Sequence, residues 1–166
     1  MKQRMVALMC ALLLLLLCAC QNKNEELLEP VSFYYCNDTV SFDTADGVIR
    51  SELREGKHFS SDAENMLREY LLGPKSEDLV SPIPAGTKLV SYMQSEEVAK
   101  ITLSKEFDTS GIKLSLASGC IAKTLAEYVP ITEVEFYVED GLIDNKEFLA
   151  ITVADIVLAD MVEQKG

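Results

Sequence analysis

The sequence predicts an α+β domain in which two helices pack on one face of a small antiparallel or mixed sheet. Three features predict this class: two stretches have apolar residues at helical spacing, several short runs are rich in β-forming residues, and turn-forming residues separate them. Their order along the chain is hairpin, helix, hairpin, helix and strand. No segment of roughly 20–50 residues recurs, so we expect one copy of this unit.

The first predicted hairpin joins two β-prone runs. Residues 31–36 (Val-Ser-Phe-Tyr-Tyr-Cys) form the first run, and residues 48–53 form the second. Between them, residues 43–47 supply aspartate and glycine, which favour a turn. Residues 54–58 are polar and are expected to connect this hairpin to the first helix.

The first helix is predicted between Ser61 and Gly73 because its apolar residues share one face. Ser61 and Glu64 have the S-x-x-E spacing of a capping box. Gly73 and Pro74 then end the helix, since glycine accepts a left-handed cap and proline cannot continue a helix. A stiff loop rich in proline follows at 81–87. The apolar face consists of Ala63, Met66, Leu67, Tyr70 and Leu71.

The second hairpin is predicted from residues 88–93 and 98–103. In the second of these runs, three apolar residues alternate with three polar ones, so one face is expected in the core and the other in solvent. The apolar set is Ala99, Ile101 and Leu103, and the polar set is Lys100, Thr102 and Ser104.

A second core-facing helix and a last strand complete the prediction. The helix has Leu114, Ala117, Ile121, Leu125 and Tyr128 at helical spacing and ends before Pro130, and the strand 133–138 turns Val134, Phe136 and Val138 to one face. For the tail we favour a turn and a short helix capped by Thr152. A strand over 148–153 is the alternative.

The beginning of the chain has the pattern of an export signal. Lys2 and Arg4 precede an apolar run at 6–17, which is shorter than the roughly 20 residues that a membrane span needs. The following Leu-Cys-Ala-Cys resembles the bacterial lipobox, in which the last cysteine receives a diacylglyceryl group and becomes the new N-terminus. We therefore expect a palmitate-type lipid on Cys20, with 1–19 as signal peptide, 20–30 as tether and 31–166 as one domain.

The charge of the chain limits its partners. The formal net charge is −12, and it becomes more negative once residues 1–19 are removed, because they contain two basic residues and no acidic one. Such a chain is a poor ligand for nucleic acid or for an anionic membrane surface. The lipid must therefore provide the attachment, which predicts a location at the outer face of the cytoplasmic membrane.

Three blocks carry a family resemblance: Leu-Leu-Gly-Pro at 71–74, Pro-Ile-Pro-Ala-Gly-Thr at 82–87 and Leu-Ser-Lys-Glu-Phe at 103–107. Together they resemble the GerMN domain, the sporulation and spore germination domain. Residues 124–128 and 134–138 fall where that family has its second helix and last strand, so the likeness covers 31–157.

This resemblance implies a fold similar to ring-building modules of secretion-type envelope assemblies. Members of the family are often exported lipoproteins without known catalysis. The resemblance therefore implies a non-catalytic role in sporulation or germination. The chain departs from the family pattern at Gly141 and Ala150, where family members commonly have a glycine-rich turn and a further glycine.

The candidate reactive residues favour simple explanations. His58 is the only histidine and lies in a polar stretch without a nucleophile motif, so we expect no catalytic triad, enzyme activity, cofactor or metal. With Cys20 acylated, Cys36 and Cys120 could form one disulfide, although two separate buried thiols are the preferred interpretation. Turn or surface roles explain the carboxylates Asp38, Asp43, Asp46, Asp144, Glu133, Glu135, Glu139 and Asp140.

The function predicted from these observations is a non-enzymatic protein-interaction module in cell-envelope or sporulation and germination assembly. Its partner is expected to be an envelope protein that contacts a sheet edge and the stiff loop, and self-association stays open. The alternative is a small-ligand-binding or sensor lipoprotein, with its ligand between the second helix and the sheet. The candidate partner-binding residues are Leu79, Val80, Pro82, Ile83 and Pro84.

Overall fold

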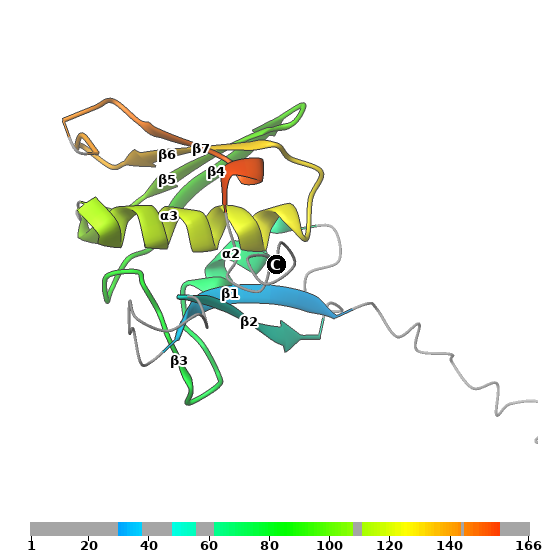
Figure 1. Cartoon of the computed structure of the whole chain (residues 1–166). Coiled ribbons are helices and arrows are strands. Elements are labelled where there is room, and N and C mark those ends of the chain that lie inside the picture. The colour runs from blue at the N-terminus through cyan, green and yellow to red at the C-terminus, as the bar shows by residue number, and fades with distance from the viewer. Residues whose placement is uncertain (1–29, 38–47, 56–61, 108–110, 144, 157–166) are drawn as a thin grey trace, which may run out of the picture.

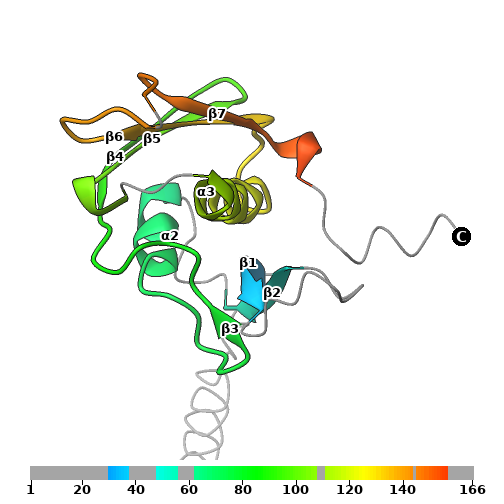
Figure 2. The ribbon, with the colours of Figure 1, turned by 60° about the vertical axis from the view of Figure 1, so that its left-hand side comes forward.

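The computed structural model describes residues 30–37, 48–55, 62–107, 111–143 and 145–156. In this part of the chain two α-helices, α2 (Ala63–Tyr70) and α3 (Gly111–Ala126), lie between a three-stranded and a four-stranded sheet (Figure 1 and Figure 2). The predicted α+β class with two core-facing helices is confirmed. The finer arrangement differs, since the strands divide into two sheets and the helices are covered on both sides.

The three-stranded sheet has the order β2-β1-β3, with β1 (Val31–Asn37) in the middle. β1 pairs antiparallel with β2 (Ile49–Arg54), as the predicted hairpin requires. On its other side β1 pairs with β3 (Leu79–Val80), which places Cys36 opposite Val80. A strand of two residues has no alternation to recognise, and β3 was not predicted.

The four-stranded sheet has the order β4-β5-β6-β7. β4 (Leu89–Ser95) and β5 (Val98–Leu103) form the predicted antiparallel pair. β6 (Glu133–Val138) is parallel to β5, because the crossover through α3 returns the chain in the same direction. β7 (Leu149–Thr152) then pairs antiparallel with β6 and places Ala150 opposite Glu135.

The sequence of α3 explains why it can lie between two sheets. Besides the predicted apolar face, small residues on its other sides are also buried: Ser118, Gly119, Cys120 and Ala122. Small side chains allow close approach on several sides, whereas α2 buries only one stripe, Ala63, Met66, Leu67 and Tyr70. No helix of the described residues is long and apolar enough to cross a membrane.

Aromatic residues join β1 to α2 in the core. The rings of Tyr35 and Tyr70 stack with their centroids 4.7 Å apart. The hydroxyl of Tyr35 donates to the Tyr70 carbonyl at 2.9 Å, and the hydroxyl of Tyr70 donates to the Tyr34 carbonyl at 2.8 Å. Both buried hydroxyls are therefore satisfied by backbone oxygen, so the contact joins sheet and helix without an unpaired polar group.

Three local predictions need correction. The cap of α2 is Asp62, whose Oδ1 accepts from the Asn65 N–H at 3.1 Å, and not Ser61, which lies outside the described residues. Ser104, predicted on the solvent face, is buried, and its hydroxyl is satisfied there by the Lys88 N–H, from which it accepts at 2.9 Å. The tail forms β7 before the 3₁₀ turn Val153–Asp155, so the strand alternative is correct for 149–152.

Candidate functional site

The structure separates the five predicted partner-binding residues into two groups. Leu79 and Ile83 are only 8% and 9% exposed and belong to the hydrophobic core. Val80 is exposed, and Pro82 and Pro84 are half-buried. The first group therefore anchors the segment, and the second group presents it to solvent; their role in binding stays a prediction.

Local hydrogen bonds and fixed dihedral angles hold the proline-rich loop in one shape. The hydroxyl of Ser81 accepts from the Ile83 N–H at 3.2 Å. At the other end, the Thr87 hydroxyl donates to the Pro84 carbonyl at 2.8 Å, and Gly86 has a φ of 86°, which glycine adopts without strain. Because proline also fixes φ, little freedom remains between 81 and 87.

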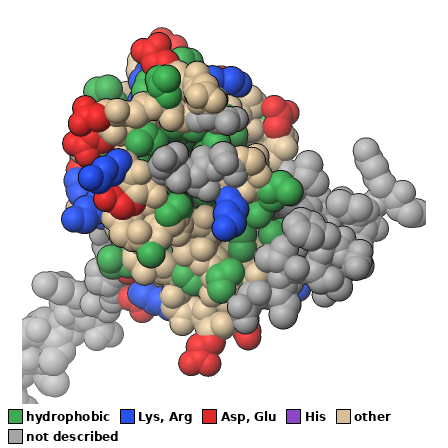
Figure 3. All heavy atoms as spheres, turned by 90° about the vertical axis from the view of Figure 1, so that its left-hand side faces the viewer, with side chains coloured by type: hydrophobic (Ala, Val, Ile, Leu, Met, Phe, Trp, Pro, Cys, Tyr) green, Lys and Arg blue, Asp and Glu red, His purple; other side chains and the backbone are tan. Residues whose placement is uncertain are grey.

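A groove of about 380 Å³ lies between this loop and the N-terminal half of α3. Figure 3 looks at this side of the molecule and shows hydrophobic side chains nearer its middle, with acidic side chains towards its rim. In the following we call this groove the loop groove. Its lining consists of Cys36, Ser81, Pro82, Ile83 and Pro84 from the sheet and loop, and Lys113 and Leu116 from α3.

Lys113 is the one charged side chain among the described residues that line the loop groove. It is exposed, and within the described part of the chain it has neither a hydrogen-bond nor an ion-pair partner. Ile112 beside it is 65% exposed. The loop groove therefore combines apolar walls with a positive charge that no described residue compensates, in a chain whose net charge is −12.

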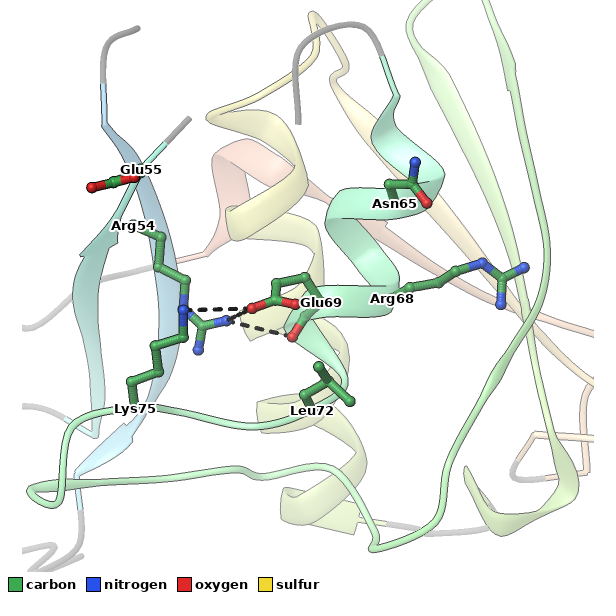
Figure 4. Close-up of a pocket in the computed structure, with 7 residues that line it drawn as sticks. All are labelled: Arg54, Glu55, Asn65, Arg68, Glu69, Leu72 and Lys75. Carbon is green, nitrogen blue, oxygen red and sulfur yellow. Dashed lines mark hydrogen bonds and ion pairs between the residues drawn. The ribbon is translucent and has the colours of Figure 1, made fainter. Parts of the chain in front are cut away.

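A second hollow, of about 660 Å³, lies beside α2 (Figure 4). We call it the α2 cleft. Arg54 points across it from the end of β2 towards Glu69 on α2, whereas Arg68 points away from Arg54. Its lining consists of Arg54, Glu55, Asn65, Arg68, Glu69, Leu72 and Lys75.

Arg54 is buried and fully engaged within the protein. Its Nε donates to Glu52 Oε1 at 2.8 Å, and its Nη2 donates to the Gly73 carbonyl at 2.7 Å. The guanidinium lies 4.4 Å from the ring centroid of Phe33. Arg54 thus fixes the end of β2 to the segment that follows α2, and it leaves few donors for a ligand.

Arg54, Glu52, Glu69 and the Gly73 carbonyl form one polar cluster, in which Glu52 is the main counterion of Arg54. Its side chain is 11% exposed and accepts from the Ser76 N–H at 2.9 Å and the Lys75 N–H at 3.0 Å. Burial raises the pKa of Glu52, but these backbone donors and Arg54 outweigh burial and hold the pKa below its usual value. The carboxylate is therefore ionised at neutral pH.

Sequence reasoning missed this cluster. The sequence predicts Arg54 in a polar connection, but Arg54 is the last residue of β2 and is 6% exposed. Its partners Glu69 and Gly73 come from a different element, so no local pattern indicated them. The alternation of β2 gave no signal either, because it predicts Leu53 inside and Arg54 outside, whereas Leu53 is 69% exposed and Arg54 is buried.

The remaining candidate residues give no reaction centre in the described part of the chain. Glu135 pairs with Lys100 at 2.9 Å and accepts from the Tyr137 hydroxyl at 2.7 Å. No group of three or more His, Cys, Asp or Glu residues in this part is placed to hold a metal ion. Cys20, His58 and the aspartates at 38, 43, 46 and 144 lie outside the described residues.

Comparison with known proteins identifies the family. The family model described as "Germane: Sporulation and spore germination" matches residues 32–144. The chain belongs to the Germane family. The resemblance to the GerMN domain inferred from the sequence is thereby confirmed. No curated protein matches the chain.

Solved structures support the Germane fold. The chain is similar to the tandem GerMN domains of the sporulation protein GerM from Bacillus subtilis, with a TM-score of 0.57, 17% identity, and coverage of 80% of this chain and 48% of that one. It is also similar to the first GerMN domain of GerM, with a TM-score of 0.51, 14% identity, and coverage of 78% and 97%. These identities show the fold alone, and the chain spans about half of the tandem structure.

Proposed function

We propose that this Germane domain is a non-enzymatic protein-interaction module in envelope or sporulation and germination assembly. The observation that carries the proposal is the loop groove. It has apolar walls, and its Lys113 has no hydrogen-bond or ion-pair partner among the described residues. Germane-type domains are not known as enzymes, which agrees with this class of function. The family assignment supports sporulation or germination as the setting of the proposed assembly.

The rigidity of the groove wall supports a docking role. A loop that is already fixed by proline, glycine and internal hydrogen bonds loses little conformational entropy when a partner binds. Leu79 and Ile83 hold the segment in the core, so Val80, Pro82 and Pro84 are presented at constant positions. A site of this kind suits a segment of an envelope protein with apolar side chains and one carboxylate that pairs with Lys113.

The proposed lipid anchor is compatible with access to the groove. β1 begins at Val31, next to the proposed tether 20–30, and Cys36 at its other end lines the loop groove. The five residue steps from Val31 to Cys36 correspond to about 17 Å along a strand. We propose that lipid on Cys20 holds the domain at the outer face of the cytoplasmic membrane, with the groove at the end of β1 away from the tether.

Site-specific photo-crosslinking in intact cells tests the docking role. A photoreactive residue at Val80 is expected to give one dominant cross-linked protein, whereas the same residue at Ala150, which is exposed on β7, is expected to give none. A cross-link between two copies would identify self-association. Equal labelling from both positions would overturn the proposal. For the anchor, fatty-acid labelling that persists in Cys20→Ser would overturn the lipid assignment.

A small-ligand-binding or sensor role is the second candidate. The α2 cleft favours it, because Lys75 is 72% exposed and Arg68 is 50% exposed at a hollow of about 660 Å³. The sequence had placed such a ligand beside the second helix instead. A thermal-shift screen with envelope metabolites separates the candidates, since the docking proposal predicts no stabilising compound.

A further inference from the structure

β1 and α3 lie against each other with opposite chain directions (Figure 1). At one point the Tyr34 N–H donates to Thr124 Oγ1 at 2.9 Å, and the Tyr34 hydroxyl donates to Glu127 Oε1 at 3.2 Å. Further along β1, Cys36 lines the loop groove together with Leu116 and Lys113 of α3. The C-terminal end of β1 therefore lies beside the N-terminal half of α3.

This register brings two thiols together. Cys36 follows Tyr34 by two residues on the same face of β1, a step of about 6.6 Å along a strand. Cys120 precedes Thr124 by four residues on the same face of α3, a step of about 6 Å along a helix. The two steps match, so Cys36 and Cys120 are direct neighbours across the packed elements. Both are free thiols and are buried, with exposures of 3% and 0%.

The two thiols differ in access and acidity. Cys36 borders the loop groove, whereas Cys120 lies behind it in the core. A hydrogen bond from the Cys120 thiol lowers the pKa of Cys36. The same interaction, together with burial, raises the pKa of Cys120. Because the thiolate is the reactive form, Cys36 is the first thiol to react.

We propose that Cys36 and Cys120 are a disulfide-forming site that joins the three-stranded sheet to α3 covalently. The oxidant is a disulfide of small-molecule or protein origin that enters through the loop groove. The site does not depend on the docking role, since it follows from the packing of β1 on α3 and from the position of Cys36 at the groove.

The reaction is a thiol–disulfide exchange in two steps. The Cys36 thiolate attacks one sulfur of the oxidant, which forms a mixed disulfide and releases the other oxidant sulfur as a thiolate. Cys120 then loses its proton and attacks Cys36 Sγ, which forms the internal disulfide and releases the second oxidant thiol. Two protein thiols are oxidised, one disulfide is reduced to two thiols, and the two protons leave with those thiols.

The test equilibrates the purified full chain with oxidised glutathione under native conditions. Free thiols are then blocked, the chain is digested without reduction, and the peptides are identified by mass spectrometry. We expect a peptide pair that joins Cys36 to Cys120. We also expect thermal unfolding to move up by ~10 °C in the oxidised chain, because the cross-link closes a long loop between residues 36 and 120.

Two single variants test the order of the steps. In Cys120→Ala, Cys36 is expected to keep glutathione as a mixed disulfide, because no second thiol can displace it. In Cys36→Ala, Cys120 is expected to stay unmodified while the chain is folded. The proposal is overturned if the folded wild-type chain keeps both thiols free or if the linked peptide forms only in denaturant. Glutathione on Cys120 but not on Cys36 would overturn the assignment of the first thiol.

Discussion

The α2 cleft and the loop groove are both hollows at the surface of one domain, and they differ in how their charges are satisfied. In the α2 cleft, Arg54 is 6% exposed and its donors are used by Glu52, Glu69 and Gly73. In the loop groove, Lys113 is exposed and has no described partner. The larger hollow therefore has a buried, saturated cation beside two exposed, ion-paired ones, Arg68 and Lys75, whereas the cation of the smaller hollow has no partner among the described residues.

This difference separates stability from binding. A buried cation that is paired within the fold is costly to remove, because its counterion is left without compensation. An exposed cation contributes little to stability and can form an ion pair with a binding partner. Volume alone would have favoured the α2 cleft as the site, whereas the state of the polar groups favours the loop groove for docking.

Arg54→Met is expected to have the largest effect on stability. The change removes the guanidinium from Glu52 and from the Gly73 carbonyl, so the free energy of unfolding should fall by about 3–5 kcal/mol. Urea denaturation measures the change. The matched control is Arg68→Met in the same cleft, where a half-exposed ion pair with Glu64 is lost and the expected change is below about 1 kcal/mol. Equal losses in both variants would contradict the distinction between the two arginines.

Ile83→Ala is expected to have the next largest effect. Ile83 is 9% exposed and packs in the core, so its truncation should lower the free energy of unfolding by about 2–4 kcal/mol. Val80→Ala, at an exposed position of the same segment, should cost below about 1 kcal/mol. Chemical denaturation of the pair checks this. If Val80→Ala were the more destabilising change, the division of the segment into anchoring and presented residues would be wrong.

Glu52→Gln is expected to show a pH-dependent loss. The folded state holds the pKa of Glu52 below its usual value, so Glu52 stabilises the domain above the unfolded-state pKa of about 4.3, and this stabilisation disappears as the pH falls through the lower, folded-state pKa. We expect a loss of about 1–2 kcal/mol at pH 7 that shrinks under acidic conditions. Denaturation curves of both chains across this range provide the measurement. A difference that does not change with pH would show that the charge of Glu52 is not its source.

The fold could be predicted largely from the sequence because its helices and longer strands have regular patterns. The apolar faces of α2 and α3, the pairing of β4 with β5 and the left-handed Gly73 all follow from local spacing. The division into two sheets did not follow, since it depends on β1 choosing β2 and β3 as neighbours. The position of β1 also depends on its packing against α3, and such contacts between distant residues cannot be recognised in a local sequence pattern.

The candidate site was predicted only in part. The stiffness of the loop 81–87 follows from its prolines and glycine, and the structure adds that Leu79 and Ile83 face inwards. The contribution of α3 to the loop groove, through Lys113 and Leu116, joins residues about 30 positions apart in the chain. Contacts of this kind depend on tertiary structure, and so does the contact between Cys36 and Cys120.

Lys113→Glu is expected to have the smallest effect on stability and a clear effect on docking. Because Lys113 is exposed and has no described partner, the free energy of unfolding should change by less than about 0.5 kcal/mol. The cross-linking yield from Val80 should fall about fivefold, since a carboxylate on the partner now meets a like charge. Lys146→Glu changes the net charge equally at an exposed loop position and should leave the yield unchanged. If both variants lower the yield alike, the partner senses the overall charge of the domain, and the loop groove has no special part in recognition.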